Sequence, residues 1–238
     1  MFNATIASLL KIGQCPSASI CVIKNDEVVW ANTYGFSQVW LRQKADASSI
    51  YMIGSTTKTI TATALLQLYE QGLFNLDDDI NSYLPFQLRN PKHPDVPITF
   101  RMLLSHSASI YDYCIFKPVG LLDVIKFMPF PETIDEWLPD VLTPGGTFYR
   151  EDYWLDSPPG SQTTYSSIGY LVVGCLVEKL SGMSIDKYCE NNIFQPLEMD
   201  NTSYDMQRLD RDNMVTPYIS TDSECTSRCL SMTLRVSH

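Results

Sequence analysis

The feature that most constrains the fold is a pair of apolar stretches with helical periodicity, residues 55–71 and 167–180. In the first stretch, apolar residues recur three and four positions apart, at Ile60, Ala64, Leu65 and Leu68. The second stretch repeats this pattern, at Ile168, Leu171, Val172, Cys175 and Leu176. Such spacing gathers the apolar residues on one face of a helix. A glycine follows each stretch, as is typical of a helix C-terminus, so the sequence predicts two long helices.

Two segments near the N-terminus, residues 18–24 and 27–34, are rich in β-branched and aromatic residues. Asn25-Asp26 lies between them and is a turn signal, so the two segments predict a β-hairpin. We expect three shorter helices, at residues 1–12, at 99–105 with Thr99 as the N-cap, and from Ser184 to about Phe194.

Charge and ligand patterns exclude several classes of function. The formal net charge is −10, whereas a nucleic-acid binder needs clustered Lys and Arg to displace counterions, so we expect no nucleic-acid partner. The seven cysteines form no C-x-x-C pair and the three histidines are scattered, so we expect no metal site. The phosphate-binding patterns G-x-x-x-x-G-K-[ST] and G-x-G-x-x-G do not occur, and we expect no cofactor.

The sequence predicts neither a secretory signal nor a membrane span. Lys11 interrupts the only apolar stretch among the first 23 residues. No window holds about 18 uncharged apolar residues. The odd number of cysteines is typical of reduced thiols in a cytosol-like compartment. We therefore expect a cytoplasmic protein.

Ser55 and Lys58 form an S-x-x-K pattern at the start of the first long helix. A serine there exposes its hydroxyl, and its backbone N–H and the positive end of the helix dipole favour a developing oxyanion. A lysine three positions later lies on the same helix face, where a neutral amine can accept the serine proton. The pattern also begins at Ser8 and Ser184, but only at Ser55 does a glycine precede it and a long apolar helix follow.

Tyr165 and Ser167 form a second candidate, at the start of the other long helix and after the turn signal at 158–160. A tyrosine hydroxyl beside a lysine ammonium has a depressed pKa and can relay a proton. The alternative is a structural role, which most of the 13 tyrosines must have. His106 leaves two interpretations open: the base of a Ser–His pair, or a helix-end histidine that bonds a free carbonyl, which we favour.

Five segments occur in the order of the landmarks of one family. They are residues 53–59 around the S-x-x-K pattern, 76–85, 98–106 (similar to "itirhLLtH"), 159–170 (similar to "PG…YSN.gY") and 196–202 (similar to "PLGM.dT"). Over about residues 3–218 the chain thus resembles the β-lactamase-related serine hydrolases, which include class C β-lactamases, penicillin-binding-protein-like proteins and family VIII esterases.

The resemblance implies an acyl-transfer enzyme that acts on a small-molecule ester or amide, as a carboxylesterase, a β-lactamase or a D-peptidase-like enzyme. Ser55 would be the nucleophile, and Lys58 and Tyr165 would share the general-base and proton-relay work. Ser167 would bind substrate, at a position where the family usually has Asn. A hydroxyl lacks the reach and the paired groups of an amide, and this mildly favours an esterase. The sequence does not define the oligomeric state.

The resemblance also implies an α/β fold of the β-lactamase/transpeptidase type. We expect a partial antiparallel sheet flanked by helices, with a helical subdomain at about residues 75–160. This domain would span residues 1–215, and residues 216–238, which lack a convincing period, would be a loose tail.

The sequence departs from the family pattern in two places. Residues 107–110 read Ser-Ala-Ser-Ile where the family tends to have "tSGl", so the glycine is absent. The third catalytic motif, K-T-G or H-x-G on a strand, is also absent, since no glycine follows Gly182. The expectation is therefore a domain truncated at its C-terminus, without the strands that complete the sheet. A second hypothesis stays open: a non-catalytic relative that binds a ligand or partner through the remaining cleft.

Overall fold

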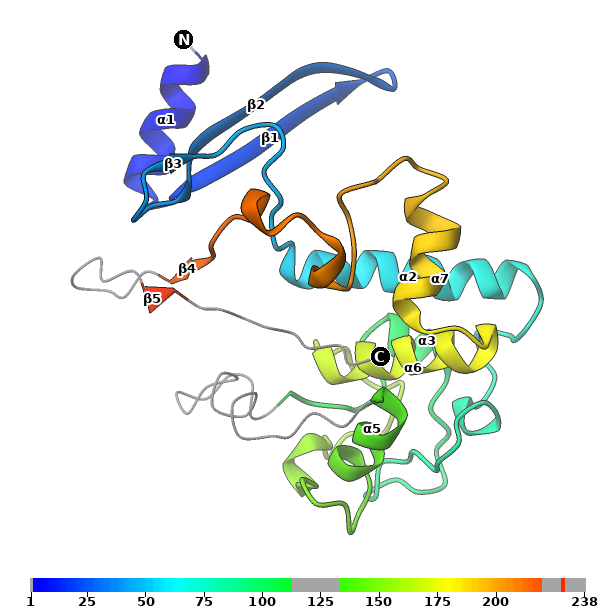
Figure 1. Cartoon of the computed structure of the whole chain (residues 1–238). Helices are drawn as coiled ribbons and strands as arrows, with labels where there is room; N and C mark the ends of the chain where they lie inside the picture. The colour runs from blue at the N-terminus through cyan, green and yellow to red at the C-terminus, as the bar shows by residue number, and fades with distance from the viewer. Residues whose placement is uncertain (1, 113–132, 220–227, 230–238) are drawn as a thin grey trace. The chain divides into compact units, whose positions relative to one another are not determined.

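Figure 1 shows the computed structural model of the chain, which describes residues 2–112, 133–219 and 228–229. The described residues divide into two compact units. The first unit contains residues 2–53, 201–219 and 228–229, and the second contains residues 54–112 and 133–200.

The first unit is built on an antiparallel sheet with the strand order β1-β2-β3. Its strands are β1 (Ser17–Lys24), β2 (Glu27–Gln38) and β3 (Gln43–Lys44). Asn25 and Asp26 make the turn between β1 and β2, with φ angles of 52° and 61°. Asn and Asp adopt this left-handed conformation more readily than other residues with a side chain, and two such residues in succession suit a two-residue hairpin. The predicted hairpin is confirmed.

Helix α1 (Phe2–Ile12) precedes the sheet and contacts β2. The ring of Phe2 meets that of Trp30 edge-on, with the centroids 4.9 Å apart. The Tyr34 hydroxyl donates to Asn3 Oδ1 at 2.7 Å. The helix predicted at residues 1–12 is confirmed, although none of its residues is buried.

The segment that leads into strand β4 belongs to the first unit. The Thr216 N–H donates to the Ser37 carbonyl at 2.9 Å, and the Val39 N–H donates to the Tyr218 hydroxyl at 2.8 Å. Strands β4 (Tyr218–Ile219) and β5 (Arg228–Cys229) pair antiparallel. The remainder of the expected tail at 216–238 lies outside the described residues.

Two long helices, α2 (Thr57–Glu70) and α6 (Ser167–Ser181), pack against each other in the second unit. The buried residues of α2 form one stripe: Thr61, Ala64, Leu65 and Leu68. Helix α6 also contacts α3, α5 and α7, and more of its residues are therefore buried: Ile168, Gly169, Val172, Val173, Gly174, Cys175, Leu176 and Val177. Both predicted helices are confirmed, with one correction, because Leu171 is exposed. Gly182 ends α6 with a φ of 68°, in the left-handed conformation that glycine favours.

Shorter elements surround these two helices: α3 (Phe100–Leu104), α5 (Ile134–Leu142), α7 (Ile185–Cys189) and a π-helical turn at Glu190–Phe194. Single 3₁₀ turns occur at Gly54–Thr56, Ile80–Ser82 and Glu151–Tyr153 in the second unit, and at Met206–Arg208 and Arg211–Asn213 in the first. Thr99 Oγ1 accepts a hydrogen bond from the Met102 N–H, which confirms the predicted N-cap. Residues 113–132 of the expected helical subdomain lie outside the described residues.

The combination of helices with a small antiparallel sheet confirms the predicted α/β class. In the described part of the chain, no single helix is both long and apolar enough to cross a membrane. Among the helices of the described residues, one bent pair, Ser167–Ser181 with Ile185–Phe194, reaches the necessary length and composition together.

Candidate active site

The predicted S-x-x-K residues lie on the first turn of the helical segment that becomes α2. Gly54 opens a 3₁₀ turn with a φ of 52°, and this turn runs directly into α2 at Thr57. Lys58 is one helical turn beyond Ser55, and its Nζ donates to Ser55 Oγ at 3.2 Å. Ser55 is exposed and Lys58 is half-buried. The geometry presents a hydroxyl to solvent with an amine beneath it.

The N-terminus of α6 brings the other two predicted residues to the same point. The Tyr165 hydroxyl donates to Ser55 Oγ at 2.8 Å, and Lys58 Nζ donates to Ser167 Oγ at 3.3 Å. Lys58 Nζ also lies 5.0 Å from the centroid of the Tyr165 ring. All four side chains predicted from the sequence therefore meet in one cluster, although 110 positions separate Ser55 from Tyr165.

The contact with Lys58 changes the acidity of Tyr165. The hydrogen bond to Lys58 is the largest cause that lowers the pKa of the phenol, and the hydrogen bond to Ser55 is the next. The positive charge of Lys58 favours the phenolate over the phenol. A phenol with a lowered pKa releases and regains a proton more easily near neutral pH, as a proton relay requires.

Hydrogen bonds to the segment after α3 hold the chain that leads to Tyr165. The Gly160 N–H donates to the Ser107 carbonyl at 2.7 Å, and the Thr164 N–H donates to the His106 carbonyl at 2.7 Å. Gly160 has a φ of 84°, and a Cβ atom there would lie 2.9 Å from Met102 Cε. These contacts explain why a glycine turn precedes the tyrosine.

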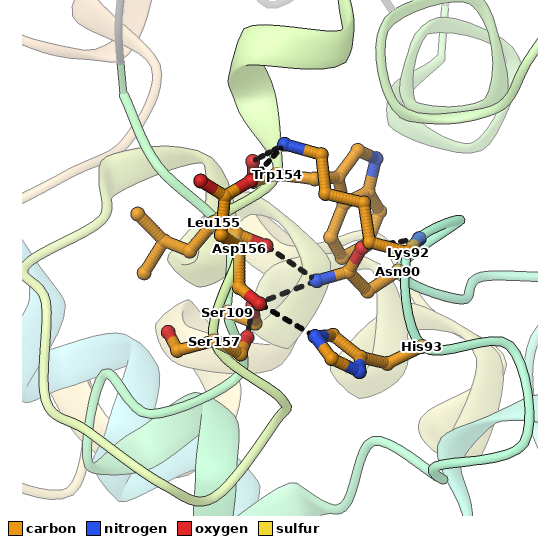
Figure 2. Close-up of polar contacts among 8 residues, drawn as sticks. All are labelled: Asn90, Lys92, His93, Ser109, Trp154, Leu155, Asp156 and Ser157. Carbon is orange, nitrogen blue, oxygen red and sulfur yellow. Dashed lines mark hydrogen bonds and ion pairs between the residues drawn. The ribbon is translucent and has the colours of Figure 1, made fainter.

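Figure 2 shows a buried polar network that anchors this segment. Asn90 is fully buried, and its amide donates to Ser109 Oγ at 2.8 Å and to the Leu155 carbonyl at 2.9 Å. Ser109 Oγ in turn donates to the Ser157 carbonyl at 2.6 Å. Lys92 adds an ion pair of 2.7 Å with Asp156. The network joins the segments around residues 90, 109 and 155 to one another.

Ser109 stands where the resembled family has its glycine, and its backbone keeps a glycine-like conformation with a φ of 63°. A residue with a Cβ atom adopts this conformation at a cost of about 1–2 kcal/mol. The two hydrogen bonds of the Ser109 hydroxyl in Figure 2 offset that cost. The serine is therefore accommodated in a left-handed backbone conformation by the two hydrogen bonds of its hydroxyl.

His106 lies beside the cluster as a hydrogen-bond acceptor. Its Nδ1 accepts the Ser166 N–H at 3.2 Å. Its ring lies against those of Tyr165 and Tyr170, with centroids 4.6 Å and 4.9 Å away. Burial is the first cause that lowers the pKa of this imidazole, and the positive charge of Lys58 is the second. Neither sequence interpretation described this contact, because His106 accepts an amide proton from α6 and does not donate to a free carbonyl.

Asp112 is a site residue that the sequence reasoning missed. Its side chain is fully buried and accepts hydrogen bonds from the start of α6. Nothing in the spacing of the sequence links Asp112 to Tyr165, since 53 positions separate them. Among the described residues, no group of three or more His, Cys, Asp or Glu side chains could hold a metal ion.

Comparison with known proteins links this geometry to a family. The chain is 28% identical over 201 residues to Protein flp of Staphylococcus aureus (strain N315), an alignment that covers 82% of this chain and 36% of that protein. The octameric penicillin-binding protein homologue from Pyrococcus abyssi superposes with a TM-score of 0.76 at 26% identity, over 96% of this chain and 49% of that one. EstCE1, a hydrolase with promiscuous acyltransferase activity, superposes with a TM-score of 0.74 at 21% identity, over 94% and 56%.

The chain thus spans between about a third and a little over half of the length of these proteins. The family model described as Beta-lactamase matches residues 2–220 of the 238 residues. The chain therefore belongs to the beta-lactamase family.

Proposed function

We propose that the chain carries a serine hydrolase site that forms an acyl-enzyme at Ser55. The observation that carries the proposal is the environment of Ser55 Oγ, which has Lys58 Nζ at 3.2 Å and the Tyr165 hydroxyl at 2.8 Å. A serine hydroxyl is a weak nucleophile unless a group within hydrogen-bond reach takes its proton. Here two such groups converge on one exposed oxygen.

The reaction follows from this arrangement. As Ser55 Oγ bonds to the carbonyl carbon of the substrate, its proton passes to the neutral amine of Lys58 or to the phenolate of Tyr165, whichever is in its basic form. The Ser55 N–H and the positive end of α2 stabilise the developing oxyanion. The leaving alkoxide or amine takes up the proton as the C–O or C–N bond breaks. Water then hydrolyses the acyl-enzyme, which releases the acid and restores the Ser55 hydroxyl.

Carboxyl esters are the substrate class that we propose first. Ser167 Oγ lies within 3.3 Å of Lys58 Nζ, and it replaces the amide that the resembled family uses to contact an amide substrate. A single hydroxyl offers fewer directed hydrogen bonds to such a substrate than an amide does. EstCE1 is itself described as a hydrolase with promiscuous acyltransferase activity, which fits an ester substrate.

The second candidate function is ligand binding without turnover. One observation favours it: the sequence lacks a K-T-G or H-x-G motif, which in the resembled family supplies a second oxyanion donor. Loss of one such donor typically reduces kcat by about 10²–10³-fold. The binding hypothesis predicts that a substrate analogue binds while esters are not hydrolysed.

The test is the hydrolysis of p-nitrophenyl acetate and butyrate by the purified chain, with a fluorescent phosphonate as a label for activated serine. Ser55→Ala should abolish both turnover and labelling. Ser184→Ala is the matched control, because Ser184 begins another S-x-x-K pattern but lies at the N-cap of α7. Equal loss in both variants, or turnover that survives Ser55→Ala, would contradict the proposal. A folded chain with neither turnover nor labelling would favour the binding hypothesis.

A further inference from the structure

The carboxylate of Asp112 is buried against the start of α6, where it contacts the residues next to Tyr165. Asp112 Oδ1 accepts from the Ser166 hydroxyl at 2.7 Å and from the Ile168 N–H at 3.1 Å. Oδ2 accepts from the Ser167 N–H. Among the described residues, all the hydrogen bonds to this carboxylate come from residues 166–168.

A buried carboxylate is costly unless donors surround it, so this arrangement must be organised around the charge. Here the donors are two backbone N–H groups and a hydroxyl at the positive end of α6, where a negative charge is favoured. The ordinary cap of the helix does not need Asp112, since the Ser166 hydroxyl already accepts from the Gly169 N–H at 2.9 Å. Asp112 comes from a segment far away in the sequence and accepts a hydrogen bond from that capping hydroxyl.

Each N–H group at the start of α6 consequently has its own acceptor. The Ser166 N–H donates to His106 Nδ1, the next two N–H groups donate to Asp112, and the Gly169 N–H donates to Ser166 Oγ. All four N–H groups that open the helix are therefore satisfied. The two side chains that reach Ser55 and Lys58 belong to Tyr165 and Ser167, which flank Ser166 directly.

We propose that Asp112 is a positioning residue for the Ser55 site, one that sets where the Tyr165 hydroxyl and Ser167 Oγ lie. The proposal rests on the proposed function for its effect on turnover, but its geometric part is independent of turnover. Both carboxylate oxygens act as acceptors, whereas an amide offers only one acceptor oxygen. Asp112→Asn therefore leaves at least one backbone N–H at the helix start facing an NH₂ group, with almost no change in volume.

The experiment compares Asp112→Asn with Asp135→Asn as the matched control. Asp135 lies on α5 and forms an ion pair with Lys179 near the C-terminal end of α6, so its replacement removes a carboxylate that contacts α6 but leaves the start of α6 intact. A displacement of about 1 Å at a reacting group can reduce a rate by about 10²-fold. We expect Asp112→Asn to lower kcat for p-nitrophenyl butyrate by about 10–100-fold, with KM changed less than about threefold. Asp135→Asn should leave both constants near those of the unmodified chain.

The second measurement is the ionisation of Tyr165, which requires no turnover. Ultraviolet titration of the chain minus that of its Tyr165→Phe counterpart isolates this phenol from the other tyrosines. In Asp112→Asn, the pKa of Tyr165 should rise toward the ordinary value near 10, because the phenol moves away from Lys58. An unchanged Tyr165 titration in Asp112→Asn would overturn the assignment, whatever the activity, and so would a kcat equal to that of the control.

Ser166→Ala provides a second variant if Asp112→Asn does not fold. It removes the hydroxyl that joins Asp112 to Gly169 and keeps the buried carboxylate with its two backbone donors. The Tyr165 titration should move in the same direction by a smaller amount, and a titration that does not move would again overturn the assignment. If the unmodified chain neither hydrolyses esters nor labels at Ser55, the proposed function fails, while the Tyr165 titration still decides the role of Asp112.

Discussion

Removal of one oxygen atom, in Tyr165→Phe, tests the relay at Ser55 most directly. The variant loses the 2.8 Å hydrogen bond to Ser55 Oγ but keeps the ring, and with it the contact with His106. A positioned acid–base group contributes about 10²–10⁴ in rate. Lys58 Nζ remains 3.2 Å from the same oxygen, and its neutral amine form could still take the serine proton, so we expect the lower part of this range, a loss of about 10²–10³ in kcat/KM.

This loss corresponds to about 3–4 kcal/mol of transition-state stabilisation. Stability should change much less, by about 0.5 kcal/mol or less, because Tyr165 is 43% exposed. The assay is p-nitrophenyl butyrate hydrolysis beside thermal unfolding, so that a loss of activity can be separated from a loss of folded protein.

Tyr170→Phe is the matched control, since Tyr170 lies in α6, five positions after Tyr165, and its ring contacts the same histidine. Its hydroxyl donates to the Leu104 carbonyl at 3.2 Å, so its removal should cost about 1 kcal/mol of stability and leave kcat/KM within about threefold. If Tyr165→Phe keeps more than about a third of the activity, or if Tyr170→Phe loses as much as Tyr165→Phe, the relay mechanism is refuted.

Three further predictions follow from other contacts. Ser109→Gly should destabilise the chain by about 1 kcal/mol net, because the relief of about 1–2 kcal/mol of backbone strain is outweighed by the loss of two hydrogen bonds, one from the buried Asn90 amide and one to the Ser157 carbonyl. Urea unfolding checks the sign, and a stabilised variant would contradict it. Lys58→Ala should abolish phosphonate labelling, whereas His106→Asn should retain it, because the imidazole bonds to Ser166; the opposite result would establish the Ser–His alternative. The hydrogen bond to Lys179 is the first cause that lowers the pKa of Asp135. This contact should therefore stabilise the folded chain by about 0.5 kcal/mol above about pH 4, and the stabilisation should be lost as the pH falls through the folded-state pKa of Asp135. A difference in melting temperature between the chain and Asp135→Asn that persists at pH 2 would refute this assignment.

The three S-x-x-K patterns show how structure separates one site from coincidence. Ser8 lies within α1, where its hydroxyl donates to the Ala4 carbonyl at 2.9 Å. Ser184 lies at the N-cap of α7, as expected, but its side chain makes no capping hydrogen bond. Only Ser55 has both the lysine amine and a tyrosine hydroxyl on its oxygen. The sequence had pointed to the same pattern, because only at Ser55 does a glycine precede it and a long apolar helix follow.

The features that the sequence by itself determined are those encoded by neighbours along the chain. Helices α2 and α6 follow from apolar spacings of three and four, and the hairpin follows from Asn25-Asp26. The pairing of Ser55 with Lys58 is equally local, since residues three apart share a helix face. Leu171 lies between Ile168 and Cys175 on the predicted apolar face but is exposed, because periodicity alone does not reveal which neighbours cover a helix.

Tertiary structure alone decided how distant segments meet. Tyr165 and Ser167 were candidates by their setting, but their approach to Ser55 and Lys58 depends on the packing of α6 against α2. Asp112 had no sequence signal at all, although it accepts three hydrogen bonds from the start of α6. The physical reason is that local spacing specifies which face of a helix is apolar, whereas the residue that meets a given polar group is set by the packing of the whole core.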